Sequence, residues 1–167
     1  MLKLEFPNKS HKQAYEKLIK EWGNGYKAPQ TLFYGKTFEE FLGNVIKEID
    51  GLEGFVPAHL FFLIDDEIKN EIIGAIQIRH NINHPNLIED GGHIGYGINP
   101  KYRKKGYGKI MLSLALEKIK ELGLDIDKIS ITCDIANIGS NKIIQSNGGI
   151  FDKKVKDETK NRYWINL

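Results

Sequence analysis

The segment 95–110, GYGINPKYRKKGYGKI, restricts the possible fold more than any other part of the sequence. Its first residues alternate glycine with larger side chains, which predicts a strand that Pro100 ends. The chain then passes through a basic, glycine-rich turn directly into a helix expected from Gly106. No acidic residue occurs between Asp90 and Glu117. A strand, a glycine turn and a helix in this order predict a site for an anion.

The start of the expected helix gives the physical reason for anion binding. The first turn of a helix leaves four N–H groups unpaired and carries about half a positive charge, which favours phosphate oxygens. Gly106 and Gly108 lack the Cβ atoms that would hold a phosphate away, and Arg103, Lys104 and Lys105 add positive charge. A solvated basic turn is the alternative for a charge cluster alone, but the strand and helix around it favour a phosphate site.

The composition limits the other possible functions. The chain has 24 Lys and Arg against 22 Asp and Glu, so its net charge of +2 provides no general attraction to nucleic acid or to an anionic membrane. The single cysteine, Cys133, excludes an intramolecular disulfide and favours a reducing compartment. The first ten residues lack the apolar core of a signal peptide, and no apolar run approaches the ~18 residues of a membrane span. We therefore predict a cytoplasmic protein without a membrane or nucleic-acid partner.

The periodicity of apolar residues predicts an α/β fold with the order β-α-α-β-β-β-α-β-α-β-β. The 167 residues fit one domain, 1–167, with a mixed, mainly antiparallel, twisted sheet flanked by helices. Strands are expected at 2–6, 59–65, 71–79, 93–99, 128–134, 148–155 and 161–167, and helices at 10–22, 37–49, 106–122 and 137–147. Thr37 and Glu40 form a capping-box pattern at the start of the second helix.

The turn RKKGYG resembles the pyrophosphate loop of the GNAT superfamily of acyl-coenzyme-A-dependent N-acetyltransferases. That loop has Arg or Gln, two further residues, Gly, one residue, and Gly or Ala, and the chain supplies Arg103, Gly106 and Gly108. The strand before the loop ends in the apolar-x-Pro pattern of the family, with Ile98 as the apolar residue.

A second family motif follows in the expected order. It consists of an Asn after the next strand, a small residue three positions later and a Gly that ends the helix, and it is met by Asn137, Ser140 and Gly148. The segments RHNINHPNLIEDGGHIGY and TCDIANIGSNKIIQSNGG are especially similar to a bacterial subgroup of predicted acetyltransferases. The resemblance covers the C-terminal two thirds of the chain, and residues 1–54 only by the order of elements.

The resemblance implies an enzyme that transfers an acetyl group from acetyl-CoA directly to a primary amine of a small molecule or a peptide. It implies no metal, and it is compatible with a homodimer. The backbone of Ile98 is expected to pair with the pantetheine arm, and its N–H group is a candidate donor to the developing oxyanion. The residues expected to contact the cofactor are Ile98, Arg103, Lys104, Lys105, Gly106, Tyr107, Gly108, Lys109, Asn137 and Ser140.

One position departs from the family pattern. Many members carry a Tyr seven residues after the motif Asn, where it protonates the departing thiolate, whereas this chain has Ile144. We expect Ile144 to lie in the core. The absent Tyr leaves open an alternative function, a non-catalytic module that binds coenzyme A or another polyphosphate and regulates a partner.

The catalytic candidates are residues near the predicted motif strand. A base with a pKa near neutrality is needed to deprotonate the amine, and histidine has such a pKa without tuning. His93 and His80 are the candidates, although for both of them a structural role, such as pairing with a backbone group at a strand start for His93, is favoured over that of a base. Tyr96 is either a site hydroxyl or a core aromatic, and Asp134 could orient a base, bind the substrate ammonium or cap the next turn. His84 and His80 share a metal-like spacing, but the intervening loop disfavours zinc.

The acceptor is expected to be selected by the segments that least resemble a motif. These are the loop 22–36, the segment 51–58 and the loop 81–91. Their aromatic residues could line an acceptor groove or pack the two N-terminal helices, and we favour packing.

Overall fold

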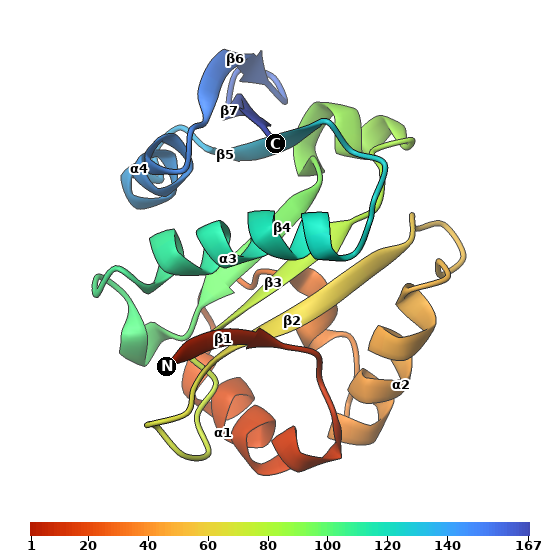
Figure 1. Cartoon of the computed structure of the whole chain (residues 1–167), viewed down its shortest axis with the longest axis vertical. Coiled ribbons are helices and arrows are strands. Elements are labelled where there is room, and N and C mark those ends of the chain that lie inside the picture. The colour runs from red at the N-terminus through yellow and green to blue at the C-terminus, as the bar shows by residue number, and fades with distance from the viewer.

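The computed structural model describes every residue from Met1 to Leu167 and confirms the predicted order of strands and helices (Figure 1). The strands are β1 (Leu2–Glu5), β2 (Ala58–Asp65), β3 (Gly74–Arg79), β4 (Ile94–Ile98), β5 (Lys128–Asp134), β6 (Ile150–Val155) and β7 (Lys160–Asn166). The helices are α1 (Lys12–Trp22), α2 (Phe38–Glu48), α3 (Tyr107–Glu121) and α4 (Ile138–Ser146). The predicted mixed α/β fold with mainly antiparallel strands is therefore confirmed.

The strands form two antiparallel sheets, with the orders β1-β2-β3-β4 and β5-β7-β6. The two sheets meet where the His93 N–H donates to the carbonyl oxygen of Ser130 at 2.8 Å, just before β4 begins. No ladder continues this contact along β4 and β5. Beyond this contact β4 and β5 are not paired by hydrogen bonds, and we call this unpaired region between them the gap, which lies at the centre of the candidate site.

Side chains along the four-stranded sheet alternate between two cores. On β2, Phe61 and Leu63 pack in the core that includes α3, whereas Leu60 and Phe62 pack with α1 and α2. Figure 1 shows α3 across the front of this sheet, with α1 and α2 on its opposite side. We refer to these sides as the α3 face and the α1/α2 face.

The start of α2 agrees with the capping pattern in the sequence. The Thr37 hydroxyl oxygen accepts a hydrogen bond from the Glu40 N–H at 3.1 Å, as predicted. The Glu40 carboxylate accepts from the N–H of Lys36 at 2.7 Å, one residue earlier than a capping box requires. The cap fixes the helix so that its last residue, Glu48, is buried against the sheet.

The structure differs from the prediction at the edges of several elements. The strand expected at 71–79 begins at Gly74, because Glu71 instead forms ion pairs with Lys17 and Lys101. The expected loop before β4 contains a π-helical turn at Leu87–Gly91. No helix in the structure is long and apolar enough to cross a membrane.

Candidate active site

The gap between β4 and β5 exposes backbone groups of β4. The Asn99 N–H donates to the carbonyl oxygen of Ile73 at 2.9 Å, next to β3. Successive residues of an antiparallel strand direct their backbone groups to opposite sides, so the N–H and C=O of Ile98 point away from β3 and toward the gap. The Ile98 carbonyl oxygen accepts from Arg103 Nε at 3.0 Å. The Ile98 N–H is therefore placed to donate to a group in the gap.

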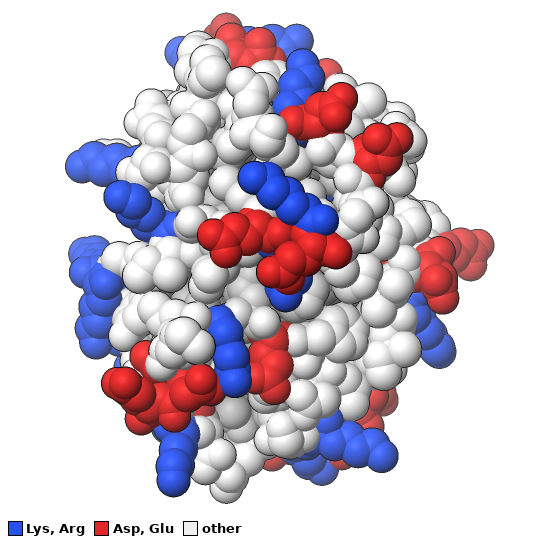
Figure 2. Space-filling model, viewed as in Figure 1, with Lys and Arg blue, Asp and Glu red and all other residues white.

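The basic turn leads into α3 as the sequence predicts. Gly106 precedes the helix with φ +85°, a left-handed conformation that favours glycine, and it has open space around its Cβ position. The first turn of α3, from Tyr107, contains no acidic residue. Figure 2 shows Lys and Arg side chains along the edge of the molecule where α3 begins. Lys104, Lys105 and Lys109 are exposed there. The helix start can accept an anion.

Arg103, although exposed, turns back from this basic turn toward β4 and α1. Its guanidinium lies 5.3 Å from the centre of the Trp22 ring, in addition to its hydrogen bond with Ile98. The turn that carries the predicted cofactor residues is thereby connected to α1 and to β4.

On the other side of the gap, Tyr96 of β4 reaches α4. Its hydroxyl is hydrogen-bonded to the Ser140 hydroxyl, and burial raises the pKa of Tyr96 to about 12. Asn137 caps α4, because its side-chain oxygen accepts from the Ser140 N–H at 3.0 Å. Ser140 also lies beside the thiol of Cys133, whose pKa burial raises to about 11. Two hydroxyl groups and a protonated thiol therefore lie together on the α4 side of the gap.

Ile144 lies in the core with no exposed surface, as predicted. Ile144 packs next to Gly149 and in the core that includes α3. The position where many relatives have a Tyr therefore contributes packing in this protein.

His93 is buried where the two sheets meet. Its Nδ1 accepts a hydrogen bond from the Ser130 N–H at 2.9 Å, so the proton of the neutral ring is on Nε2. Burial lowers the pKa of His93 to about 4, and the ring is 6% exposed. At neutral pH neither ring nitrogen has a free lone pair, whereas a general base requires one.

His80 lies at the end of β3 that is farthest from Ile98. Gly74, at the start of β3, is opposite Ile98, and His80 is six residues later, about 20 Å at the usual rise of a strand. Nε2 of His80 is 2.7 Å from Nδ1 of His59, and burial lowers the pKa of both imidazoles.

Asp134 is exposed at the end of β5, beside the opening of the gap. Its carboxylate lies 4.0 Å from Nζ of Lys160, which is also paired with Asp90. Asp90 is 2.7 Å from Nζ of Lys156. Asp134 thus belongs to a group of alternating charges that connects the loop before β4 with the β6–β7 hairpin.

Three polar residues on the α1/α2 face were not predicted from the sequence. Gln77 donates to the carboxylate of Glu48, which is 3% exposed, and burial raises the pKa of Glu48 to about 7. Arg79 donates to the carbonyl oxygens of Gly91 and Gly92 at 3.2 and 3.1 Å. One sequence feature could have identified Glu48, because it continues the buried helix positions 38, 41 and 45 as a charged residue.

The loop between α1 and α2 lies directly on β4. A Cβ atom at Gly97 would overlap the carbonyl oxygen of Ala28, so only glycine allows this contact. Trp22 is buried, as expected for packing, but Tyr26, Tyr34 and Phe55 are exposed. These exposed aromatic side chains come from the segments expected to select the acceptor, and Tyr34 and Phe55 lie together, with ring centres 6.3 Å apart.

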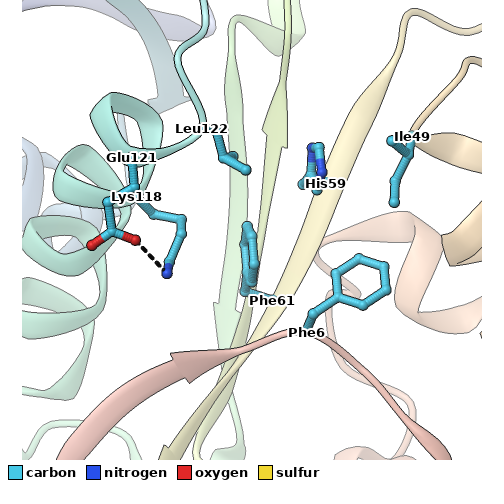
Figure 3. A pocket seen from close by; sticks show the side chains of 7 residues that line it. All are labelled: Phe6, Ile49, His59, Phe61, Lys118, Glu121 and Leu122. Atoms are coloured by element: carbon cyan, nitrogen blue, oxygen red, sulfur yellow. Dashed lines mark hydrogen bonds and ion pairs between the residues drawn. The ribbon is translucent and has the colours of Figure 1, made fainter.

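A separate cavity of about 370 Å³ lies on the α3 face (Figure 3). Figure 3 shows Phe61 and Phe6 on one side and the Lys118–Glu121 ion pair of α3 on the other. None of the residues predicted for the active site lines this cavity.

A helix start that accepts an anion, next to a strand with unpaired backbone groups, suits a ligand that carries both a phosphate and an extended arm. The family described as "Acetyltransferase (GNAT) domain" matches residues 38–150, which is more than half of the chain. The chain therefore belongs to the GNAT acetyltransferase family, and it is an acetyl-CoA-dependent N-acetyltransferase. The predicted family and cosubstrate are confirmed.

Solved structures share this fold at low sequence identity. RimL, a ribosomal L7/L12 alpha-N-protein acetyltransferase in complex with coenzyme A, has a TM-score of 0.68 and 18% identity over 99% of this chain and 94% of that chain. The microcin C7 self-immunity acetyltransferase MccE, in complex with acetyl-CoA and AMP, has a TM-score of 0.66 and 17% identity over 99% of this chain and 92% of that chain. Mutant forms of the spermidine/spermine N-acetyltransferase SpeG from Vibrio cholerae have a TM-score of 0.64 and 16% identity over 99% of this chain and 93% of that chain. No curated protein matches the chain significantly.

Proposed function

We propose that the protein transfers the acetyl group of acetyl-CoA to a primary amine by direct attack, with the reaction in the gap between β4 and β5. The observation that carries this proposal is the Ile98 backbone, which faces the gap only a short turn before the start of α3. A pyrophosphate at the first turn of α3 would lead an extended arm along β4 toward Ile98.

The residues around the gap suit three parts of the reaction. Acetyl-CoA supplies the thioester whose carbonyl carbon the amine attacks. The Ile98 N–H is placed to stabilise the oxygen that becomes negative. The Tyr96 and Ser140 hydroxyl pair can donate a proton to the departing sulfur. We expect the amine to approach past the loop between α1 and α2, because the cofactor groups belong to the α3 and α4 side.

His93 has a structural function in this proposal. The bond from Ser130 occupies Nδ1, and a pKa of about 4 leaves the ring neutral with its proton on Nε2. Its contact closes one end of the gap. His80 is paired with His59 and too far along β3 to reach the amine.

The proposal is tested by measuring the release of free thiol from acetyl-CoA with a panel of amines. Spermidine and peptides with free N-termini are the first amines to test, since structurally similar proteins are named for polyamine or protein acetylation. We expect thiol release that depends on the amine, and an acetylated product by mass spectrometry. Binding of acetyl-CoA without transfer to any amine would instead favour the non-catalytic module.

The hydroxyl of Tyr96 gives a prediction about pH. A coenzyme A thiol has a pKa near that of cysteine, about 8.5, so it leaves as an anion with a small penalty. We expect Tyr96→Phe to slow transfer by less than the ~10²-fold loss of a typical general acid. Because the pKa of Tyr96 is raised to about 12, kcat/KM of the wild type should show no falling limb below pH ~10. A falling limb in that range that disappears in Tyr96→Phe would contradict this prediction.

A further inference from the structure

Three polar side chains form a buried cluster behind β4, which we call the α2–β3 cluster: Glu48, Gln77 and Arg79. Gln77, which is 4% exposed, donates to Oε1 of Glu48. Oε2 of Glu48 has no hydrogen-bond partner in the protein. A buried carboxylate oxygen without a partner is unfavourable, and such groups are rare unless a proton or a ligand satisfies them. Oε2 is therefore a candidate position for a donor from outside the protein.

The cluster lies beside the part of β4 that faces an incoming acceptor. Gln77 is directly opposite Gly95, and opposite residues of a ladder have their side chains on the same face. Gly95 has no side chain, so β4 places no atoms between its backbone and the cluster. A Cβ atom at Gly95 would lie 3.6 Å from the Arg79 guanidinium and 3.8 Å from Cβ of Pro29, so Arg79 and the loop between α1 and α2 pack over this face of Gly95.

The cluster is closer to the Ile98 amide than either histidine along the strands. Gly95 is three residues before Ile98, or about 10 Å at the usual strand rise, whereas His93 is five residues before it, or about 16 Å. The step from Gly95 through Gln77 to Glu48 adds to this separation, so a proton would pass between the gap and Glu48 through water. Glu48 is the group of the cluster that can accept a proton near neutral pH.

The surface on this side of the molecule carries two exposed aromatic side chains. The Tyr34 phenol raises the pKa of the Arg79 guanidinium, against the larger lowering by burial, and Tyr34 is 41% exposed. Its ring lies 6.3 Å from that of Phe55, which is 56% exposed. Tyr34 and Phe55 are therefore the surface residues past which the inference brings an amine toward the cluster.

The charges around Glu48 allow it to exchange a proton at neutral pH. Burial raises the pKa of Glu48 to about 7, while the Gln77 hydrogen bond and the positive charge of Arg79 act in the opposite direction. The other titratable groups that act on Arg79 are Tyr34 and Asp90. A base with a pKa near the working pH is the most effective for proton transfer.

We propose that Glu48 is the catalytic base, which accepts the proton that the acceptor ammonium must lose, and that Gln77 positions its carboxylate. This inference rests on the proposed function. One proton passes from the ammonium to Oε2 through water, which leaves a neutral amine and a protonated Glu48. The amine nitrogen then forms a bond with the thioester carbon, the carbon–sulfur bond breaks, and the second proton lost by the nitrogen passes to the departing sulfur through the Tyr96–Ser140 hydroxyl pair. Glu48 returns its proton to solvent after the product leaves.

The test is Glu48→Gln, which keeps the shape and the hydrogen bond of the side chain but removes the base. With the panel amine that reacts fastest, kcat/KM should fall by roughly 10²–10⁴ at pH 7, and the affinity for acetyl-CoA should be unchanged. The wild type should show an acid limb with a midpoint of about 7, and this limb should be absent in the variant. The matched control is Glu16→Gln, an exposed position on α1, which should have the wild-type rate.

Gln77→Leu tests the positioning role. Loss of a hydrogen bond that lowers the pKa of Glu48 should move the acid limb to higher pH, and restoring a donor with Gln77→Asn should move it back toward the wild-type midpoint. A purely structural effect would lower the plateau without moving the limb.

The outcomes separate this inference from the proposed function. An active wild type with an equally active Glu48→Gln variant, and the same pH profile in both, would overturn the inference alone. A wild type that acetylates no amine would overturn the proposed function. The inference about Glu48 would then fall as well, because no ammonium would need a base. If Glu48→Gln does not fold, Glu48→Asp should retain activity with a displaced acid limb, and an undisplaced limb would count against Glu48.

Discussion

Gly106→Asp is expected to abolish the stabilisation that acetyl-CoA gives to the fold. At a hundredfold excess over its dissociation constant, a ligand that binds only the folded state adds ~2.7 kcal/mol to the free energy of unfolding. An aspartate before α3 would accept hydrogen bonds from the first-turn N–H groups and repel the pyrophosphate from them. Thermal unfolding with and without acetyl-CoA measures the effect.

The variant itself should fold, because Asp tolerates a positive φ better than most residues and is a favourable cap. Gly123→Asp is a matched control at the other end of α3, since Gly123 has φ +64° and open space around its Cβ position. It should keep the full stabilisation by acetyl-CoA. Gly108 is less suitable for the test, because a side chain there would collide with Ile143. An equal thermal shift in wild type and Gly106→Asp would contradict the assigned cofactor site.

Below pH 6.5, the wild type should lose up to about 3 kcal/mol of stability through His93. The folded-state pKa of about 4 lies below the usual value of 6.5, so between these values the unfolded chain binds more protons. This contribution is therefore fully present above pH 6.5 and is lost as the pH falls toward 4. Urea unfolding of wild type and His93→Gln at pH 7 and pH 4.5 measures the difference.

His93→Gln should lose less stability on acidification, because an amide can still accept the Ser130 N–H but does not titrate. The same variant should retain acetyl transfer, since the proposed base is elsewhere. Parallel loss of stability in both proteins would contradict the first expectation. If the rate of acetyl transfer falls roughly 10²-fold or more in a folded His93→Gln variant, His93 is the catalytic base after all.

The cofactor side of the site was accessible from the sequence because its residues are neighbours in the chain. Arg103, Gly106 and Gly108 lie within one turn, so a local pattern specifies the loop and the helix that follows it. The periodicity of apolar residues likewise predicted the order of the elements. Both predictions depend on information within a short window.

The acceptor side was not accessible in this way. Glu48 and Gln77 are 29 residues apart and meet only when α2 packs on β3. The helix positions 38, 41, 45 and 48 could mark Glu48 as buried, but its partner Gln77 and its raised pKa depend on tertiary contacts that no local pattern contains. The division into two sheets was also missed, because alternation shows that a segment is a strand but not which strand it pairs with.

The single backbone contact between the two sheets has a consequence for how the molecule fluctuates. β5, β7 and β6 share a core with α3, but only the bond from His93 to Ser130 connects their backbone to β4. Hydrogen exchange distinguishes regions that open separately from those that open only when the whole chain unfolds. Strands that share side-chain packing but no backbone ladder can separate locally. A ligand bound in the gap contacts both sheets, so it links the two regions into one cooperative unit.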